Sequence, residues 1–162
     1  MDGRIVEHVR VDGATADGII VRGGEIRVRY RIRCDDAWRV KELELLSLDD
    51  DRRIALGADG QGRWSDPGLE GCIDVDIEAS PFTNTIAICR LRLAPGESAD
   101  IRAAFVSVSE FHVTPARQRY TRLAADRYRY DGLDTDFTTE LPVDADGLVI
   151  DYPDWFRRVW PR

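Results

Sequence analysis

The sequence predicts a mainly β protein: one domain built around an antiparallel, strongly curved sheet that forms a half-barrel or barrel, with a short C-terminal helix. Three observations predict this class. Apolar and polar residues alternate along several stretches, which is the period of a half-buried strand. Turn-forming Gly, Pro and Asp pairs recur at intervals of roughly 8–15 residues. Few stretches show helical periodicity. The 162 residues suffice for one core, so residues 1–162 are expected to form a single domain.

The clearest strand is expected over residues 25–33. Four apolar or aromatic side chains would share one face of this strand, and four arginines would share the other. The same alternation predicts further strands, which follow in chain order over residues 38–48, 99–111, 112–123, 126–132 and 136–153.

A short helix is expected at the C-terminus, over residues 151–160. Asp154 is a residue type that caps helices. The apolar residues that follow it fall at helical spacing, namely Trp155, Phe156, Val159 and Trp160. So short a helix would need to dock against the sheet to be stable.

The composition argues against nucleic acid as a partner. The net charge is −7 and the pI is about 4.9, and an acidic surface repels phosphate groups. No apolar run approaches the ~20 residues of a membrane span, and the first residues lack the apolar segment of a signal peptide. Cys34, Cys72 and Cys89 are odd in number and widely spaced, which favours reduced thiols. A cytoplasmic protein without an integral membrane segment is expected. The sequence does not specify its oligomeric state.

Three carboxylates alternate with apolar residues at Asp74, Asp76 and Glu78. The interpretation is a hairpin in which residues 71–79 pair with residues 85–93 around a turn at residues 80–84. In that register Asp74 lies opposite Arg90, as a cross-strand ion pair. The favoured reading of this face is solvated and paired with arginine. A pair of carboxyl groups for acid–base chemistry is the alternative, since their spacing overlaps that of glycosidase pairs.

Tyrosine and arginine gather between residues 117 and 132. Tyr120 and Arg122 would share a face of one strand, and Tyr128 and Tyr130 a face of the next. These side chains would suit a wall for a polar headgroup, because a tyrosine ring stacks while its hydroxyl forms hydrogen bonds. The alternative is that these tyrosines pack as a row in the core, with their hydroxyls at the rim of the core.

No stretch matches a nucleophile, phosphate-binding or dinucleotide motif. His8 and His112 are far in sequence from the carboxylates and are read as surface or structural residues. No catalytic residue, metal site or cofactor is therefore expected.

Four segments resemble the bacterial Putative glycolipid-binding family: "LEGCIDVDIEASPFTNTIAI", "RQRYTRL", "RYRYDG" and "LPVDADGLVIDYPDWFRRVW". The resemblance runs from about Tyr30 to Trp160. It implies a β-rich half-barrel similar to carriers of lipoproteins and lipids, and binding of a glycolipid. The family pattern falls on Asp74, Asp76, Ser80, Pro81, Thr83, Asn84, Tyr120, Arg122, Tyr128, Tyr130, Asp151, Tyr152 and Pro153.

The leading hypothesis is non-catalytic binding of an amphiphile, such as a glycolipid, in an apolar groove of the curved sheet. The apolar face would hold acyl chains. The residues expected to bind the ligand are Asp74, Asp76, Asn84, Tyr120, Arg122, Tyr128 and Tyr130. One alternative is an enzyme that acts on a glycosyl or acyl-linked substrate through Asp74, Asp76 or Glu78. Another is a protein-interaction subunit that pairs through an exposed sheet edge.

Overall fold

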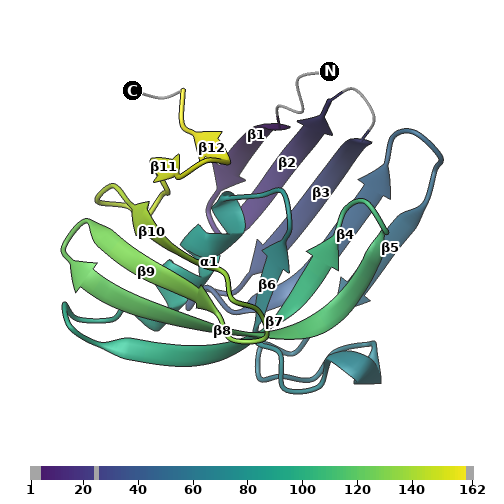
Figure 1. The fold of residues 1–162 in the computed structure, drawn as a ribbon. Helices are drawn as coiled ribbons and strands as arrows, with labels where there is room; N and C mark the ends of the chain where they lie inside the picture. Colours follow the sequence, from purple (N-terminus) through teal and green to yellow (C-terminus); the bar gives the residue numbers. More distant parts are fainter. Residues whose placement is uncertain (1–4, 24–25, 160–162) are drawn as a thin grey trace.

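Two five-stranded sheets make up most of the protein (Figure 1). The computed structural model describes residues 5–23 and 26–159. The first sheet is an antiparallel meander whose strands follow chain order: β1 (Ile5–Asp12), β2 (Thr15–Arg22), β3 (Ile26–Cys34), β4 (Val40–Ser47) and β5 (Arg53–Gly57). The second has the order β10-β9-β8-β7-β6, with β6 (Asp74–Ile77), β7 (Ser98–Ser107), β8 (His112–Ala124), β9 (Arg127–Gly132) and β10 (Thr138–Pro142). These open sheets confirm the predicted mainly β class.

The first sheet follows the predicted alternation. On β3 the side chains of Val28, Tyr30 and Ile32 are buried, whereas the arginines between them are exposed. The exposed arginines find acidic partners on neighbouring strands and turns: Arg31 pairs with Asp17, and Arg33 with Glu42. Such exposed pairs each contribute about 0–1 kcal/mol to stability. The sheet is therefore held mainly by its apolar face.

The predicted hairpin around the three carboxylates is wrong. Residues 85–93 do not pair with residues 71–79, because most of them belong to helix α1 (Phe82–Leu91). Strand β6 pairs instead with β7, and the two are parallel. Parallel neighbours need a crossover connection, which is usually a helix. Pro81 is the N-cap of α1, where its missing N–H removes no intrahelical hydrogen bond, and Arg92 ends the helix in a left-handed conformation.

Helix α1 lies between the two sheets, as Figure 1 shows. Phe82 and Ile86 belong to the core cluster that contains the first sheet, while Ala87 and Ile88 belong to the cluster of the second. Every residue from Phe82 to Ile88 is buried. The apolar faces expected to hold acyl chains are thus covered by this helix and by core side chains.

The C-terminus forms a small hairpin, so the predicted helix there is also wrong. Strand β11 (Asp151–Tyr152) pairs with β12 (Phe156–Arg157). Asp154 has a φ of 67°, which is left-handed and turns the chain back instead of capping a helix. Trp160 lies outside the described residues. The strand predicted over residues 136–153 is shorter, since β10 stops at Pro142 and only an isolated bridge joins Val143 to Val149.

The remaining helical element is a short 3-10 turn, η1 (Pro67–Leu69). It precedes β6 and buries Leu69 in the core. No helix in the described part of the chain is long and apolar enough to cross a membrane.

Candidate functional site

A pocket of about 280 Å³ opens beside β6, between side chains of the second sheet and the C-terminal hairpin. Polar side chains line one part of it: Asp76 from β6, Glu78 directly after β6, Asn84 from α1 and Gln118 from β8. Aromatic side chains line the rest: Phe105, Tyr130, Phe137, Tyr152, Trp155 and Phe156. The C-terminal hairpin therefore completes a pocket that the sheet alone would leave open.

Asp76 is the most unusual of these residues, because it is partly buried at the pocket and has no cationic partner among the described residues. Its Oδ2 accepts a hydrogen bond from Gln118 Nε2 at 2.6 Å, and its Oδ1 accepts one from Thr83 Oγ1 at 3.2 Å. No Lys or Arg among the described residues forms an ion pair with it. Burial raises the pKa of Asp76, which the hydrogen bonds from Gln118 and Thr83 oppose. The carboxyl group is thus available to a ligand in the pocket.

Asn84 links the pocket to the tyrosine behind it. Tyr120 Oη donates a hydrogen bond to Asn84 Oδ1 at 2.8 Å, and both side chains are buried. The Asn84 Nδ2 makes only a long hydrogen bond, of 3.4 Å, to the carbonyl of Pro81. The orientation of the Asn84 amide is therefore held by Tyr120, and its NH₂ group retains donor capacity.

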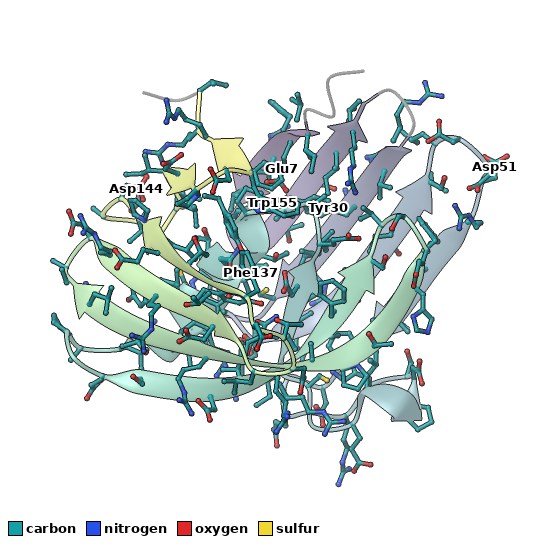
Figure 2. All side chains as sticks on the ribbon, viewed as in Figure 1. Glu7, Tyr30, Asp51, Phe137, Asp144 and Trp155 are labelled. Atoms are coloured by element: carbon teal, nitrogen blue, oxygen red, sulfur yellow. The ribbon has the colours of Figure 1, made fainter. Side chains whose placement is uncertain are left out.

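A row of aromatic rings leads from Tyr120 across the pocket wall. Tyr130 contacts Tyr120 edge to face, with ring centroids 5.4 Å apart. The row continues through Phe137 and Tyr152 to Phe156, with centroid separations of 6.0, 6.2 and 6.3 Å. Figure 2 labels Phe137 and Trp155, which both line the pocket. These rings offer an extended apolar wall to a ligand.

The charge of Asp76 acts on two hydroxyl groups of this row, those of Tyr130 and Tyr152. Burial raises the pKa of Tyr130 and of Tyr152, and the charge of Asp76 raises both further. Neither hydroxyl has a hydrogen-bond partner within the described residues. Both tyrosines are therefore neutral and can donate to, or accept from, a bound molecule.

Arg122 and Tyr128 lie away from the pocket. They are neighbours across β8 and β9, as Tyr120 and Tyr130 are, and the guanidinium of Arg122 lies over the Tyr128 ring at 5.6 Å. Arg122 donates hydrogen bonds to the carbonyls of Leu93, Ala124 and Ala125. Arg122 thereby ties the segment that precedes β7 to the connection between β8 and β9.

Asp74 is occupied by Arg90. The predicted ion pair exists, but Arg90 projects from α1 and not from a strand. It donates from Nε and Nη2 to the two carboxylate oxygens at 2.7 and 2.6 Å, and the Asp74 side chain is 1% exposed. Burial raises the pKa of Asp74, and Arg90 opposes that effect. Asp74 is therefore paired with an arginine as expected but is not solvated. Asp76 is bound by Gln118 and Thr83 in place of the expected arginine.

Glu78 is exposed at the pocket margin. It accepts hydrogen bonds from Ser107 Oγ and from the N–H of Val108. His8 and His112 are exposed and remote from the pocket lining. Over the described ranges, no group of three or more His, Cys, Asp or Glu side chains could hold a metal ion.

Comparisons with known proteins identify the family. A family model described as Putative glycolipid-binding matches residues 1–158. The chain belongs to this family. The structure is also similar to the crystal structure of a DUF1089 family protein from Pseudomonas aeruginosa, with a TM-score of 0.92 and 37% sequence identity over 98% of this chain and 94% of that one. No curated protein matches the sequence. The family match reaches further toward the N-terminus than the motifs that begin near Tyr30.

One carboxyl group in that N-terminal part of the Putative glycolipid-binding domain escaped sequence reasoning. Glu7 of β1 accepts hydrogen bonds from Tyr30 Oη at 2.7 Å, from Ser80 Oγ and from the N–H of Phe82 (Figure 2). It thereby ties the first sheet to the start of α1. Burial raises the pKa of Glu7 to about 6, although the three hydrogen bonds act to lower it. No strand was expected around Glu7, and a lone glutamate carries no sequence signal of such a contact.

Glu7 is expected to make stability depend on pH. Because its pKa rises from 4.5 to about 6 on folding, the stabilising effect is full below about pH 4.5 and is lost as pH rises through 6. That difference amounts to about 2 kcal/mol. Urea unfolding of the natural protein and of Glu7→Gln measures it, since glutamine keeps an acceptor but cannot ionise.

In the Glu7→Gln variant, the unfolding free energy should not show this loss of about 2 kcal/mol as pH rises from about 4.5 through 6. Glu110→Gln, which changes an exposed glutamate, serves as the control and should follow the natural protein. If Glu7→Gln and Glu110→Gln showed the same pH profile, Glu7 would not titrate in this range.

Proposed function

We propose that the protein binds the headgroup of an amphiphile, such as a glycolipid, in the pocket beside β6. One observation carries the proposal: Asp76 lies at an aromatic-lined pocket with its carboxyl group unpaired by any cation of the described chain. Pockets that combine apolar walls with a few polar groups are typical of small-molecule sites. Membership of the Putative glycolipid-binding family agrees with this proposal.

The size of the pocket favours a headgroup over a whole lipid. Its volume of about 280 Å³ lies at the lower limit of ligand pockets, which span roughly 300–1,000 Å³. The apolar chain of the ligand would leave past Phe137 and Trp155, whose exposed fractions are 38% and 50%. Acyl chains would thus follow this rim and not the apolar face of the sheet.

The residues expected from the sequence divide into two groups under this proposal. Asp76, Asn84 and Tyr130 contact the headgroup, through a carboxylate, an amide and a ring. Tyr120 positions Asn84. The others, Asp74, Arg122 and Tyr128, act on the fold through the contacts described above. Sequence reasoning did not include the hairpin residues Tyr152, Trp155 and Phe156 as ligand-binding residues.

The proposal also treats residues 1–162 as one working unit in the cytoplasm. The core cluster of the first sheet includes Val75, Ile77 and Val106 from the second. Helix α1 contributes to both clusters. This shared core supports a single domain.

The proposal is tested by comparing lipid adducts on two variants. Protein purified from its own cells is analysed by native mass spectrometry, and the bound molecule is extracted and identified. Trp155→Ala should reduce adduct occupancy at least about fivefold, because it removes ring surface at the rim. Leu123→Ala, which changes a similarly exposed apolar residue on β8, should leave it unchanged. Equal occupancy on both would place the ligand elsewhere.

A hydrolytic activity on a glycosyl or acyl-linked substrate is the second candidate. Asp76 and Glu78 both line the pocket, and Asp76 has a raised pKa, as a general acid requires. Under this candidate, nitrophenyl glycosides or esters would be turned over, and Asp76→Asn would abolish turnover while retaining binding. Binding without turnover would exclude it for those substrates.

A further inference from the structure

The charges that line the pocket are unbalanced. Four charged side chains reach it: Asp76, Glu78, Arg117 and Asp134. Arg117 binds both carboxylate oxygens of Asp134. Its backbone N–H donates to Oδ2 at 2.7 Å, and its Nε donates to Oδ1 at 2.8 Å. That pair neutralises itself at the rim. Asp76 and Glu78 remain without a cation among the described residues, so the pocket interior is acidic.

An acidic interior selects against anionic ligands. A phosphate, sulfate or uronic acid group would meet two carboxylates and no free guanidinium, and like charges in such proximity oppose binding. Neutral hydroxyl groups can donate to Asp76. A cation would do so and would also compensate the charge.

The aromatic wall adds a second attraction for positive charge. The face of an aromatic ring is negative, and it attracts an ammonium group within about 6 Å of its centroid. Tyr130, Phe137 and Tyr152 form a continuous run of rings beside the Asp76 carboxyl group. The charge of Asp76 reaches the hydroxyls of Tyr130 and Tyr152, so rings and carboxylate act on the same volume.

We propose that the headgroup bound in this pocket carries a free amine, as in an amino sugar, whose ammonium group pairs with Asp76 beside the Tyr130–Phe137–Tyr152 rings. This inference rests on the proposed function and narrows its ligand class. The ammonium donates to Asp76, which still accepts from Gln118 on Oδ2 and from Thr83 on Oδ1. The apolar part of the ligand leaves past Trp155.

Binding of an amine couples to the protonation of Asp76. The protonated carboxyl group has no charge to offer, so affinity for an ammonium falls as pH drops through the pKa of Asp76, which burial raises. The other charged groups at the pocket are Glu78, Arg117 and Asp134. The facing tyrosines Tyr120, Tyr130 and Tyr152 stay neutral, because burial raises their pKa.

A matched pair of amphiphiles tests the inference. Octyl 2-amino-2-deoxyglucoside and octyl glucoside differ in one substituent, an ammonium or a hydroxyl, and calorimetric titration compares their affinities. The amine should bind at least about tenfold more tightly, which corresponds to about 1.4 kcal/mol. Asp76→Asn should reduce this ratio to about one. Asp100→Asn removes the same charge from an exposed ion pair outside the pocket lining and should preserve the ratio.

The outcomes separate the two proposals. Equal affinities, or tighter binding of octyl glucoside, would overturn the cationic headgroup and leave the amphiphile site standing. A preference for the amine that survives in Asp76→Asn would place the ammonium elsewhere and overturn the assignment. Binding of neither glycoside would overturn both proposals for glycosyl headgroups.

Discussion

Replacement of Arg90 by alanine is expected to destabilise the protein by about 3–5 kcal/mol. Arg90 holds both oxygens of Asp74, and Asp74 is 1% exposed. Without Arg90, the carboxylate is left buried and unpaired between α1 and β6. The loss is far larger than the net value of the pair, because it includes the cost of the desolvated charge. Chemical unfolding measures the difference.

Arg119→Ala is the matched control for this prediction. Arg119 also makes two short contacts to a carboxylate, that of Asp100, but both side chains are about half exposed. Its loss should cost about 0–1 kcal/mol. Adding Asp74→Asn to Arg90→Ala should recover part of the stability, since it removes the charge. Similar losses for Arg90→Ala and Arg119→Ala would show that burial of the Asp74 pair has little energetic weight.

Replacement of Gly18 by alanine is expected to cost about 2–4 kcal/mol. Gly18 of β2 lies opposite Tyr30 of β3. A Cβ at Gly18 would fall 2.1 Å from Tyr30 Cζ and 2.4 Å from its hydroxyl. Tyr30 is 1% exposed, so its ring is packed in the core. Its ring would have to move, which would also break its hydrogen bond to Glu7.

Gly57→Ala controls for the change of backbone entropy. Gly57 ends β5, and a Cβ there meets nothing within 4 Å. Its effect should stay within about 0.5 kcal/mol. A small effect of Gly18→Ala in the same urea series would mean that Tyr30 can be displaced without cost.

Alternation predicted the strands because each has one buried face. On β3 and on residues 116–120 of β8 the period of two in the sequence is the period of burial in the structure, so these elements could be placed within a few residues. The pairing of Tyr120 with Tyr130 and of Arg122 with Tyr128 follows from that regularity.

Helix α1 could not be predicted because it is buried on nearly all sides. Residues 82–88 have no solvent-facing stripe, so the helical period is absent, and the β-branched residues in "TNTIAI" imitate a strand. The same error made the carboxylates of β6 look solvated. A crossover helix buries these carboxylates through tertiary packing, which cannot be read from the residue pattern of the strand itself.

The site was predicted only in part. Asp76 and Tyr130 lie on strands, whereas Asn84, which the family resemblance grouped with them, lies in α1. The aromatic residues of the C-terminal hairpin were assigned to a helix, which hid their contribution to the pocket. Glu7 could not be found, because its partners Tyr30, Ser80 and Phe82 are distant in sequence.

The helix that fills the space between the sheets has a consequence for lipid transport. A carrier must shield the tail of its cargo from water, and each exposed methylene costs about 0.8 kcal/mol. Since α1 takes up that interior, a long tail would remain uncovered after extraction, and desorption from a bilayer would be slow. Under the proposed function, this architecture favours a ligand with a short apolar chain, because a short chain exposes few methylene groups once the ligand has left the bilayer.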